Sequence, residues 1–257
     1  MIKHLTYYAF RRQSHRGNSM HEYYRNSASK IRKANEKYLS FIEKELTGLT
    51  GAEYHKLCDE IWNLYKTDML EYFPYIGGDK ASGTKNLTAS FGFVAMGEVL
   101  KNYGVSLEDT GSLMVLSYER STLAIPSPVR KIMHKMFTSP RLLNKMFLKK
   151  DITNAENAKA NPGSFETKTM IPPEEGYSFS YHNLVCPLER FARAHGYGEY
   201  MPYICSLDYV MYGVLGVPLY REHTCFEDGD YCDFKLKIGS PVMDYRPPVF
   251  SQGKGFK

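Results

Sequence analysis

The sequence predicts an α+β protein, in which an N-terminal helical region precedes an antiparallel sheet of two hairpins with helices packed on one face. Two observations support this fold class. Apolar residues recur at helical spacing, three and four residues apart, through much of residues 20–160. After residue 160, β-forming stretches and helical patterns follow in the order ββααββ. We therefore predict a flexible N-terminus (1–19), a helical region (20–160), a site-bearing α+β domain (161–240) and a tail (241–257).

The helical region shows start and stop signals between its apolar stripes. A capping box has Thr50 and Glu53 at its two ends, and Ser106 precedes an acidic first turn. Gly104 follows the last residue of an apolar pattern, where a helix commonly ends. The expected elements are a helix over 20–48, a helix that begins at the capping box, a polar loop over 79–86, and helices over 87–103 and 106–123.

Residues 120–150 carry eight Lys or Arg and no Asp or Glu, with Met, Phe and Leu between them. Such a stretch can lie on a membrane surface or cover a site as a mobile lid. A pair of short helices with an ordinary solvated basic face is the simpler interpretation, which we prefer. Residues 151–164 are small and polar, which predicts a linker.

The C-terminal domain alternates between two kinds of local pattern. β-formers separated by Pro and Gly indicate hairpins, and apolar stretches ended by Gly indicate helices. We expect strands over 165–171 and 177–185, helices over 187–194 and 200–215, and strands over 219–226 and 231–238.

Composition limits the class of partner and compartment. A net charge of +5 and a pI of about 8.7 permit an anionic small-molecule substrate but do not predict nucleic-acid binding. The five cysteines form no C-x-x-C pair, which disfavours a disulfide framework and a zinc ribbon. The chain shows no signal-peptide pattern and no apolar run long enough for a transmembrane segment. We expect a cytoplasmic protein, and a homo-oligomer stays open.

Cys205 and Asp208 lie three residues apart in one expected helix and so share a face. Asp208 interrupts a mostly apolar run, and a buried carboxylate needs a partner or a function. A structural ion pair with Arg190 or Arg193 is the alternative to a catalytic role.

Two further thiols, Cys186 and Cys232, belong to the expected hairpins. Strand alternation places Cys186 on one face with His182, Asn183 on the opposite face, and Cys232 opposite Asp233. If both hairpins form one sheet, these thiols approach the Cys205 helix. Such a set suits a nucleophilic thiol or a divalent metal that activates water, but also plain core packing. We expect the remaining thiols, Cys58 and Cys225, to be structural.

Three C-terminal motifs carry a family resemblance. The stretches Tyr181–Pro187 (YHNLVCP), Ile204–Asp208 (ICSLD) and Glu227–Phe234 (EDGDYCDF) together resemble the L-2-amino-thiazoline-4-carboxylic acid hydrolase family. The resemblance implies hydrolysis of a carbon–nitrogen bond in a small cyclic amidine acid, with no cofactor expected. The second hairpin is also similar to that of 4-vinyl reductase-type binding domains, so a sensor role stays open.

The resemblance also implies a set of site residues. Its matching catalytic positions are Cys186, Cys205, Asp208 and Cys232, where a thiolate of Cys205 or Cys232 would attack the amidine carbon. Arg193, Arg221 or a lysine of residues 130–150 could bind the substrate carboxylate. The expected substrate-binding residues are His182, Asn183, Arg193 and Asp233.

Overall fold

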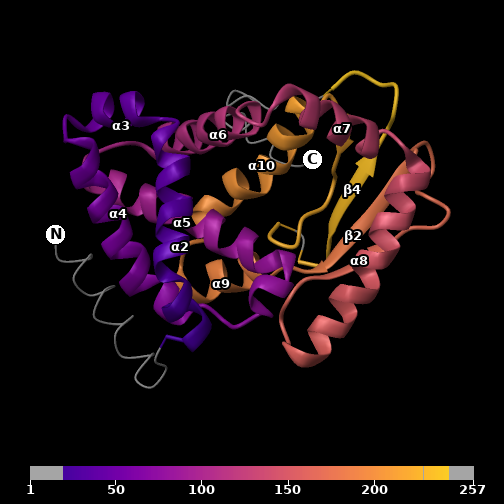
Figure 1. The fold of residues 1–257 in the computed structure, drawn as a ribbon, viewed down its shortest axis with the longest axis horizontal. Coiled ribbons are helices and arrows are strands. Elements are labelled where there is room, and N and C mark those ends of the chain that lie inside the picture. Colours follow the sequence, from indigo (N-terminus) through magenta and orange to yellow (C-terminus); the bar gives the residue numbers. More distant parts are fainter. Residues whose placement is uncertain (1–19, 228, 243–257) are drawn as a thin grey trace.

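The computed structural model describes residues 20–227 and 229–242, and it places a group of helices beside one antiparallel sheet (Figure 1). The predicted α+β class is confirmed. The expected flexible N-terminus (1–19) and most of the expected tail (241–257) lie outside the described residues. No helix within the described part of the chain is long and apolar enough to cross a membrane.

The first expected helix is divided in two, so the prediction of one helix to residue 48 is wrong. Ile42 leaves helical geometry, with φ −128° and ψ 23°, and a new helix starts after it. The predicted capping box does not form, because Glu53 itself is the N-cap of the next helix and its side chain makes no cap hydrogen bond. The Thr50 hydroxyl instead donates to the Leu46 carbonyl, 2.7 Å away. The three helices are α2 (Glu22–Ser40), α3 (Glu43–Thr50) and α4 (Tyr54–Asp68).

The next two helices follow the predicted stop and start signals. Gly104 has a φ of +76° just after the first of them. Ser106 accepts a hydrogen bond from the Asp109 amide at 3.0 Å and so caps the second. Most of the expected loop over 79–86 is helical, because a short 3-10 turn (Gly78–Lys80) leads directly into the first helix. The helices are α5 (Ser82–Asn102) and α6 (Leu107–Leu123).

The basic segment forms two helices, α7 (Ser127–Phe137) and α8 (Pro140–Ala160). The predicted linker over 151–164 is wrong, since most of it is the second half of α8. Polar side chains of this half bind the neighbouring strand: the Asp151 carboxylate accepts hydrogen bonds from the Thr167 and Thr169 hydroxyls, both at 2.6 Å. Its polar composition therefore reflects contact with the sheet and not a loop.

Both predicted hairpins join one sheet, whose strand order is β1-β2-β4-β3 with antiparallel neighbours. The expected strand over 219–226 is much shorter, because the chain leaves the sheet after two residues. Two helices separate the hairpins, as expected, and Gly196 (φ +75°) ends the first of them. The strands are β1 (Glu166–Thr169), β2 (Phe179–Val185), β3 (Leu219–Tyr220) and β4 (Cys232–Leu236), and the helices are α9 (Pro187–His195) and α10 (Met201–Val214).

Helix α10 lies between helices α4 and α5 and the sheet (Figure 1) and contributes to two apolar cores. The larger core joins α2, α4, α5 and α6 to α9 and α10, so it includes residues on both sides of the boundary predicted at residue 160. The smaller core packs Phe147 of α8 against Tyr181 of β2, with ring centroids 4.3 Å apart. The boundary itself stays a prediction.

Candidate active site

A cavity of about 470 Å³ lies where the helices meet the inner face of the sheet. Strands β2 and β4 and helices α5, α8 and α10 all contribute to its wall. The structure brings together all four residues of the expected catalytic set, since Cys186, Cys205, Asp208 and Cys232 line this one cavity. The convergence predicted from the sequence is thus present in the structure.

Asp208 forms an ion pair with the buried Arg221, whose Nη1 is 3.0 Å from its Oδ2. Arg221 also donates to the carbonyl oxygens of Cys205 at 3.0 Å and Asp233 at 3.1 Å, and its side chain is 1% exposed. The predicted alternative, an ion pair of Asp208 with Arg190 or Arg193, is therefore wrong, because the partner is Arg221. Arg221 links helix α10 to strand β4 and fixes where the Asp208 carboxylate points.

The Asp208 side chain is 40% exposed and lines the cavity. Protein atoms surround that cavity, so the carboxyl loses much of its hydration. This burial raises the pKa of Asp208, and the charges of Arg221 and Lys150 only partly oppose it. Asp208 is thus a carboxyl suited to exchange protons with a bound ligand.

Cys232 is the thiol of the set whose pKa is lowered. The side-chain hydrogen bond with Cys225 is the largest cause, and the charge of Arg221 and the Cys225 amide, 3.2 Å from Cys232 Sγ, add to it against burial. Cys225, expected to be only structural, therefore contacts the cavity thiol whose pKa is lowered. We find no sequence signal for this pair, because the loop over 221–231 decides it.

The other two thiols are less acidic than an ordinary cysteine. Burial raises the pKa of Cys186 to about 12, although it stands at the start of α9 where backbone amides of Leu188 and Glu189 oppose the shift. Burial also raises the pKa of Cys205 well above its usual value, more than the charge of Arg221 lowers it. Of the three thiols, Cys232 is the best placed to ionise near neutral pH.

The expected face of Cys186 is wrong because the strand contains a β-bulge. Thr167 of β1 pairs with Asn183 of β2, but Glu166 pairs with Val185, which leaves Leu184 as an extra residue. The bulge reverses the alternation, so Cys186 joins Asn183 at the cavity. Had the strand been regular, Cys186 would share a face with His182.

Two of the expected substrate-binding residues do not line the cavity. His182 lies on the other face of the sheet, where its Nε2 is 2.7 Å from Glu174 Oε1 and its ring stacks on Tyr231. Arg193 pairs with Glu189 on its own helix and donates to the Phe226 carbonyl. The predicted roles of both in binding a ligand have no support from this cavity.

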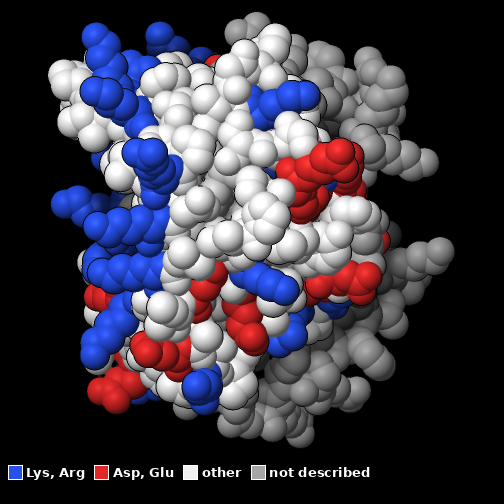
Figure 2. All heavy atoms as spheres, turned by 90° about the vertical axis from the view of Figure 1, so that its right-hand side faces the viewer, with Lys and Arg blue, Asp and Glu red and all other residues white. Residues whose placement is uncertain are grey.

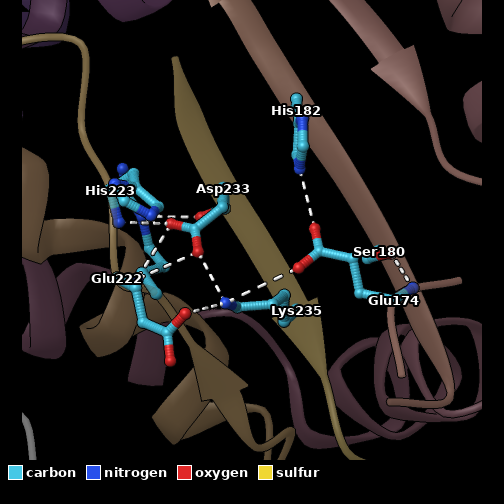
Figure 3. Close-up of polar contacts among 8 residues, drawn as sticks. Glu174, Ser180, His182, Glu222, His223, Asp233 and Lys235 are labelled. Carbon is cyan, nitrogen blue, oxygen red and sulfur yellow. Dashed lines mark hydrogen bonds and ion pairs between the residues drawn. The ribbon is translucent and has the colours of Figure 1, made fainter. Parts of the chain in front are cut away.

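Asp233 also faces away from the cavity, within a charged network on the outer face of the sheet (Figure 3). Its carboxylate accepts the amides of Glu222 at 2.9 Å and His223 at 2.7 Å, and it lies 2.9 Å from the Nζ of Lys235. These bonds hold the start of the loop over 221–231, which carries Arg221 and Cys225. Asp233 thereby orders the cavity wall without touching a ligand.

Asn183 and Lys150 present polar groups at the cavity that are available to a ligand. The Asn183 Oδ1 atom is buried and has no hydrogen-bond partner among the described residues. The Lys150 ammonium lies 5.5 Å from the ring centre of Tyr181, and burial lowers its pKa against the opposing charges of Asp208 and Asp151. An unpaired acceptor and a cation therefore face the same space as the thiol of Cys232.

The family comparison supports the sequence motifs. Residues 129–236 match the family model for L-2-amino-thiazoline-4-carboxylic acid hydrolase. The resemblance to this family is confirmed. The matched segment begins in α7 and ends with β4, so it contains every member of the expected catalytic set. No curated protein and no solved structure matches the chain.

The segment matched to the hydrolase family supplies only part of the cavity. Helices α2, α5 and α6 complete the wall with Tyr38, Thr84 and Tyr118, among others, and all three lie before the matched residues. The Thr84 Oγ1 is also buried without a partner in the described part of the chain. Sequence reasoning missed these residues, because Tyr38 and Tyr118 lie in helical patterns without a chemical motif and Thr84 lies in a stretch expected to be a polar loop.

A divalent metal ion would need several ligands that converge on one point. Across residues 20–227 and 229–242, no group of three or more His, Cys, Asp or Glu side chains is placed to hold a metal ion. Cys232 instead accepts a hydrogen bond from the Cys225 amide of the protein, 3.2 Å away.

Proposed function

We propose that this cavity hydrolyses a small cyclic amidine acid of the 2-amino-thiazoline-4-carboxylate type. The observation that carries the proposal is the thiol of Cys232, whose lowered pKa occurs beside Asp208 in one ligand-sized cavity. The family match of residues 129–236 supports the same reaction class. An unpaired acceptor and a cation complete a site that is complementary to an amidine bearing a carboxylate.

Binding follows from the charges of the ligand. The substrate carboxylate pairs with Lys150, which has no ion-pair partner in the described structure and whose ammonium favours an anion. An amidine N–H donates to the buried Asn183 Oδ1, which otherwise lacks a hydrogen bond. These two contacts orient the amidine carbon towards the inner face of β4, where Cys232 lies.

The reaction proceeds by covalent catalysis. Cys232 Sγ attacks the central carbon of the protonated amidine and forms a carbon–sulfur bond, which gives a tetrahedral adduct. The ring carbon–nitrogen bond then breaks, and the Asp208 carboxyl gives its proton to the leaving nitrogen. Water adds to the same carbon and returns a proton to Asp208. The Cys232 thiolate leaves, and the product is the ring-opened S-carbamoyl-cysteine, whose last proton goes to solvent.

Arg221 serves this scheme without contacting the ligand. Its three hydrogen bonds hold Asp208 and the backbone of α10 and β4 in place, and its charge lowers the pKa of Cys232. A fixed cation beside the thiolate also stabilises the negative charge each time Cys232 leaves.

The direct test is turnover of 2-amino-thiazoline-4-carboxylate by the purified chain, followed by mass spectrometry of the ring-opened product. Cys232→Ser removes the nucleophile, so we expect turnover to fall at least about a hundredfold. Cys58→Ala is the matched control, because Cys58 is buried in α4 and is not part of the cavity wall. Full turnover by Cys232→Ser would exclude the covalent step, and an inactive wild-type protein would exclude the reaction.

A binding or sensor role is the second candidate, favoured by the volume of the cavity. The thiazoline acid has only about nine non-hydrogen atoms, whereas pockets of about 300–1,000 Å³ commonly hold larger, drug-sized ligands. The cavity holds about 470 Å³. A larger ligand that binds tightly without turnover, together with a Cys232 that alkylates no faster than Cys186, would favour this role.

A further inference from the structure

We propose that the exposed face of helices α7 and α8 is a docking surface for an anionic membrane. The proposal is independent of the proposed catalytic function. We call this surface the α7–α8 face and define it by the outward side chains of the two helices. These are Val129, Ile132, Lys135, Met136, Arg141, Leu142, Lys145, Leu148, Lys149 and Ile152.

Large apolar side chains are exposed on this face to an extent that is unusual for a protein surface. Ile132 is 60% exposed, Leu142 50% and Ile152 63%. Of the twelve large hydrophobic residues that are exposed in the described part of the chain, six belong to this face. A concentration of exposed apolar side chains on two adjacent helices indicates an interaction surface.

The helical periodicity aligns these side chains. In α7, positions 129, 132 and 136 follow the spacing of one helix face, and none of its residues is buried. In α8, the buried side chains Leu143 and Phe147 point into the smaller core, so positions 141, 145, 148, 149 and 152 face outward. The same α8 that supplies Lys150 to the cavity therefore presents a separate outer surface.

The charge of the face is of one sign. No Asp or Glu occurs between Arg120 and Lys150, and within the described part of the chain none of the four basic side chains of the face forms an ion pair. Figure 2 views the side of the molecule on which α8 lies in Figure 1. Lys and Arg side chains form a column along the left edge of this view. Unpaired cations interleaved with apolar side chains are typical of helices that lie on anionic bilayers.

This combination favours a membrane over other partners. A symmetric contact between two copies would set like charges against each other, which opposes association. A nucleic acid would neutralise the lysines but offer little to Ile132, Leu142 and Ile152. An anionic bilayer provides phosphate charge for the lysines and an apolar boundary for the aliphatic side chains. Because no described helix could span a bilayer, the face would lie on its surface.

Sedimentation of the full chain with sucrose-loaded vesicles tests the proposal. We expect binding to vesicles of 40% phosphatidylglycerol in phosphatidylcholine, and at least about tenfold weaker binding to pure phosphatidylcholine or in 0.5 M salt. Ile132→Ser with Leu142→Ser should weaken binding about tenfold or more. Leu49→Ser with Ile171→Ser is the matched control, because both residues are similarly exposed but lie elsewhere.

Charge variants complete the test. Lys145→Glu with Lys149→Glu should abolish binding, while Lys33→Glu with Lys44→Glu, exposed lysines of α2 and α3, should leave it nearly unchanged. Equal binding by wild type and both variants of the face would overturn the proposal. So would a dimer in lipid-free solution that the face variants dissociate, or duplex DNA binding without vesicle binding. All four variants replace exposed side chains, and circular dichroism verifies that each is folded.

Discussion

Replacing Arg221 by Met tests how much of the cavity depends on one buried cation. The guanidinium donates at 3.0 Å to Asp208, at 3.0 Å to the Cys205 carbonyl and at 3.1 Å to the Asp233 carbonyl. Its carbon also lies 4.2 Å from the ring centre of Phe234. Met keeps most of the apolar volume of the side chain but removes the charge and every donor.

The expected loss of folding stability follows from the Asp208 carboxylate, which the substitution leaves without its cation. Breaking a buried ion pair by removing one partner costs about 3–5 kcal/mol, because the other charge stays uncompensated. The Asp208 carboxyl keeps access to water through the cavity, being 40% exposed, which places the cost near the lower limit. We expect Arg221→Met to lower the free energy of unfolding by about 3 kcal/mol. Adding Asp208→Asn should recover part of this loss.

Urea denaturation measures the free energy of unfolding. The pH dependence of Cys232 alkylation measures how the charge of Arg221 affects the pKa of this thiol. Because the charge of Arg221 lowers the pKa of Cys232, the alkylation profile of Arg221→Met should move to higher pH. Arg193→Met is the control, since its exposed ion pair with Glu189 contributes at most about 1 kcal/mol. An unfolding free energy within about 1 kcal/mol of wild type, with an unmoved alkylation profile, would refute the reasoning.

Three further predictions concern the thiols, the outer network and substrate binding. With limiting iodoacetamide at pH 7, Cys232 should be alkylated well before Cys205, as peptide mass spectrometry can show; the reverse order would contradict the pKa directions. The pKa of Asp233 is lowered by Lys235 and backbone amides despite burial, so the unfolded chain binds more protons than the folded one just below about pH 4. Stability from Asp233 should therefore be present above about pH 4 and lost as pH falls. In urea denaturation, the free energy of unfolding of Asp233→Asn should fall less steeply below about pH 4 than that of wild type. An equally steep fall in both proteins would show that Asp233 is not its cause. Lys150→Met should raise KM for the amidine acid at least about tenfold with little change in kcat, and a loss confined to kcat would contradict a binding role.

The sequence predicted the parts of this fold that depend on local pattern. Ser106 predicts where α6 begins and Gly196 predicts where α9 ends. The β-forming stretches after residue 160 identify both hairpins. The spacing of Cys205 and Asp208 placed both on one helix face, and both line the cavity. Local signals failed where a polar stretch had a distant partner, as in the second half of α8, which binds β1 through Asp151.

What the sequence by itself determined is the succession of a helical region and a ββααββ unit, the resemblance of residues 129–236 to one hydrolase family, and the set of thiols near one acid. Tertiary structure alone decided the pairing of Asp208 with Arg221, the bulge at Leu184 that directs Cys186 into the cavity, and the hydrogen bond between Cys225 and Cys232. The physical reason is that helix and strand periodicity act over a few neighbouring residues. Burial, ion pairing and strand register, in contrast, depend on which distant segments pack together.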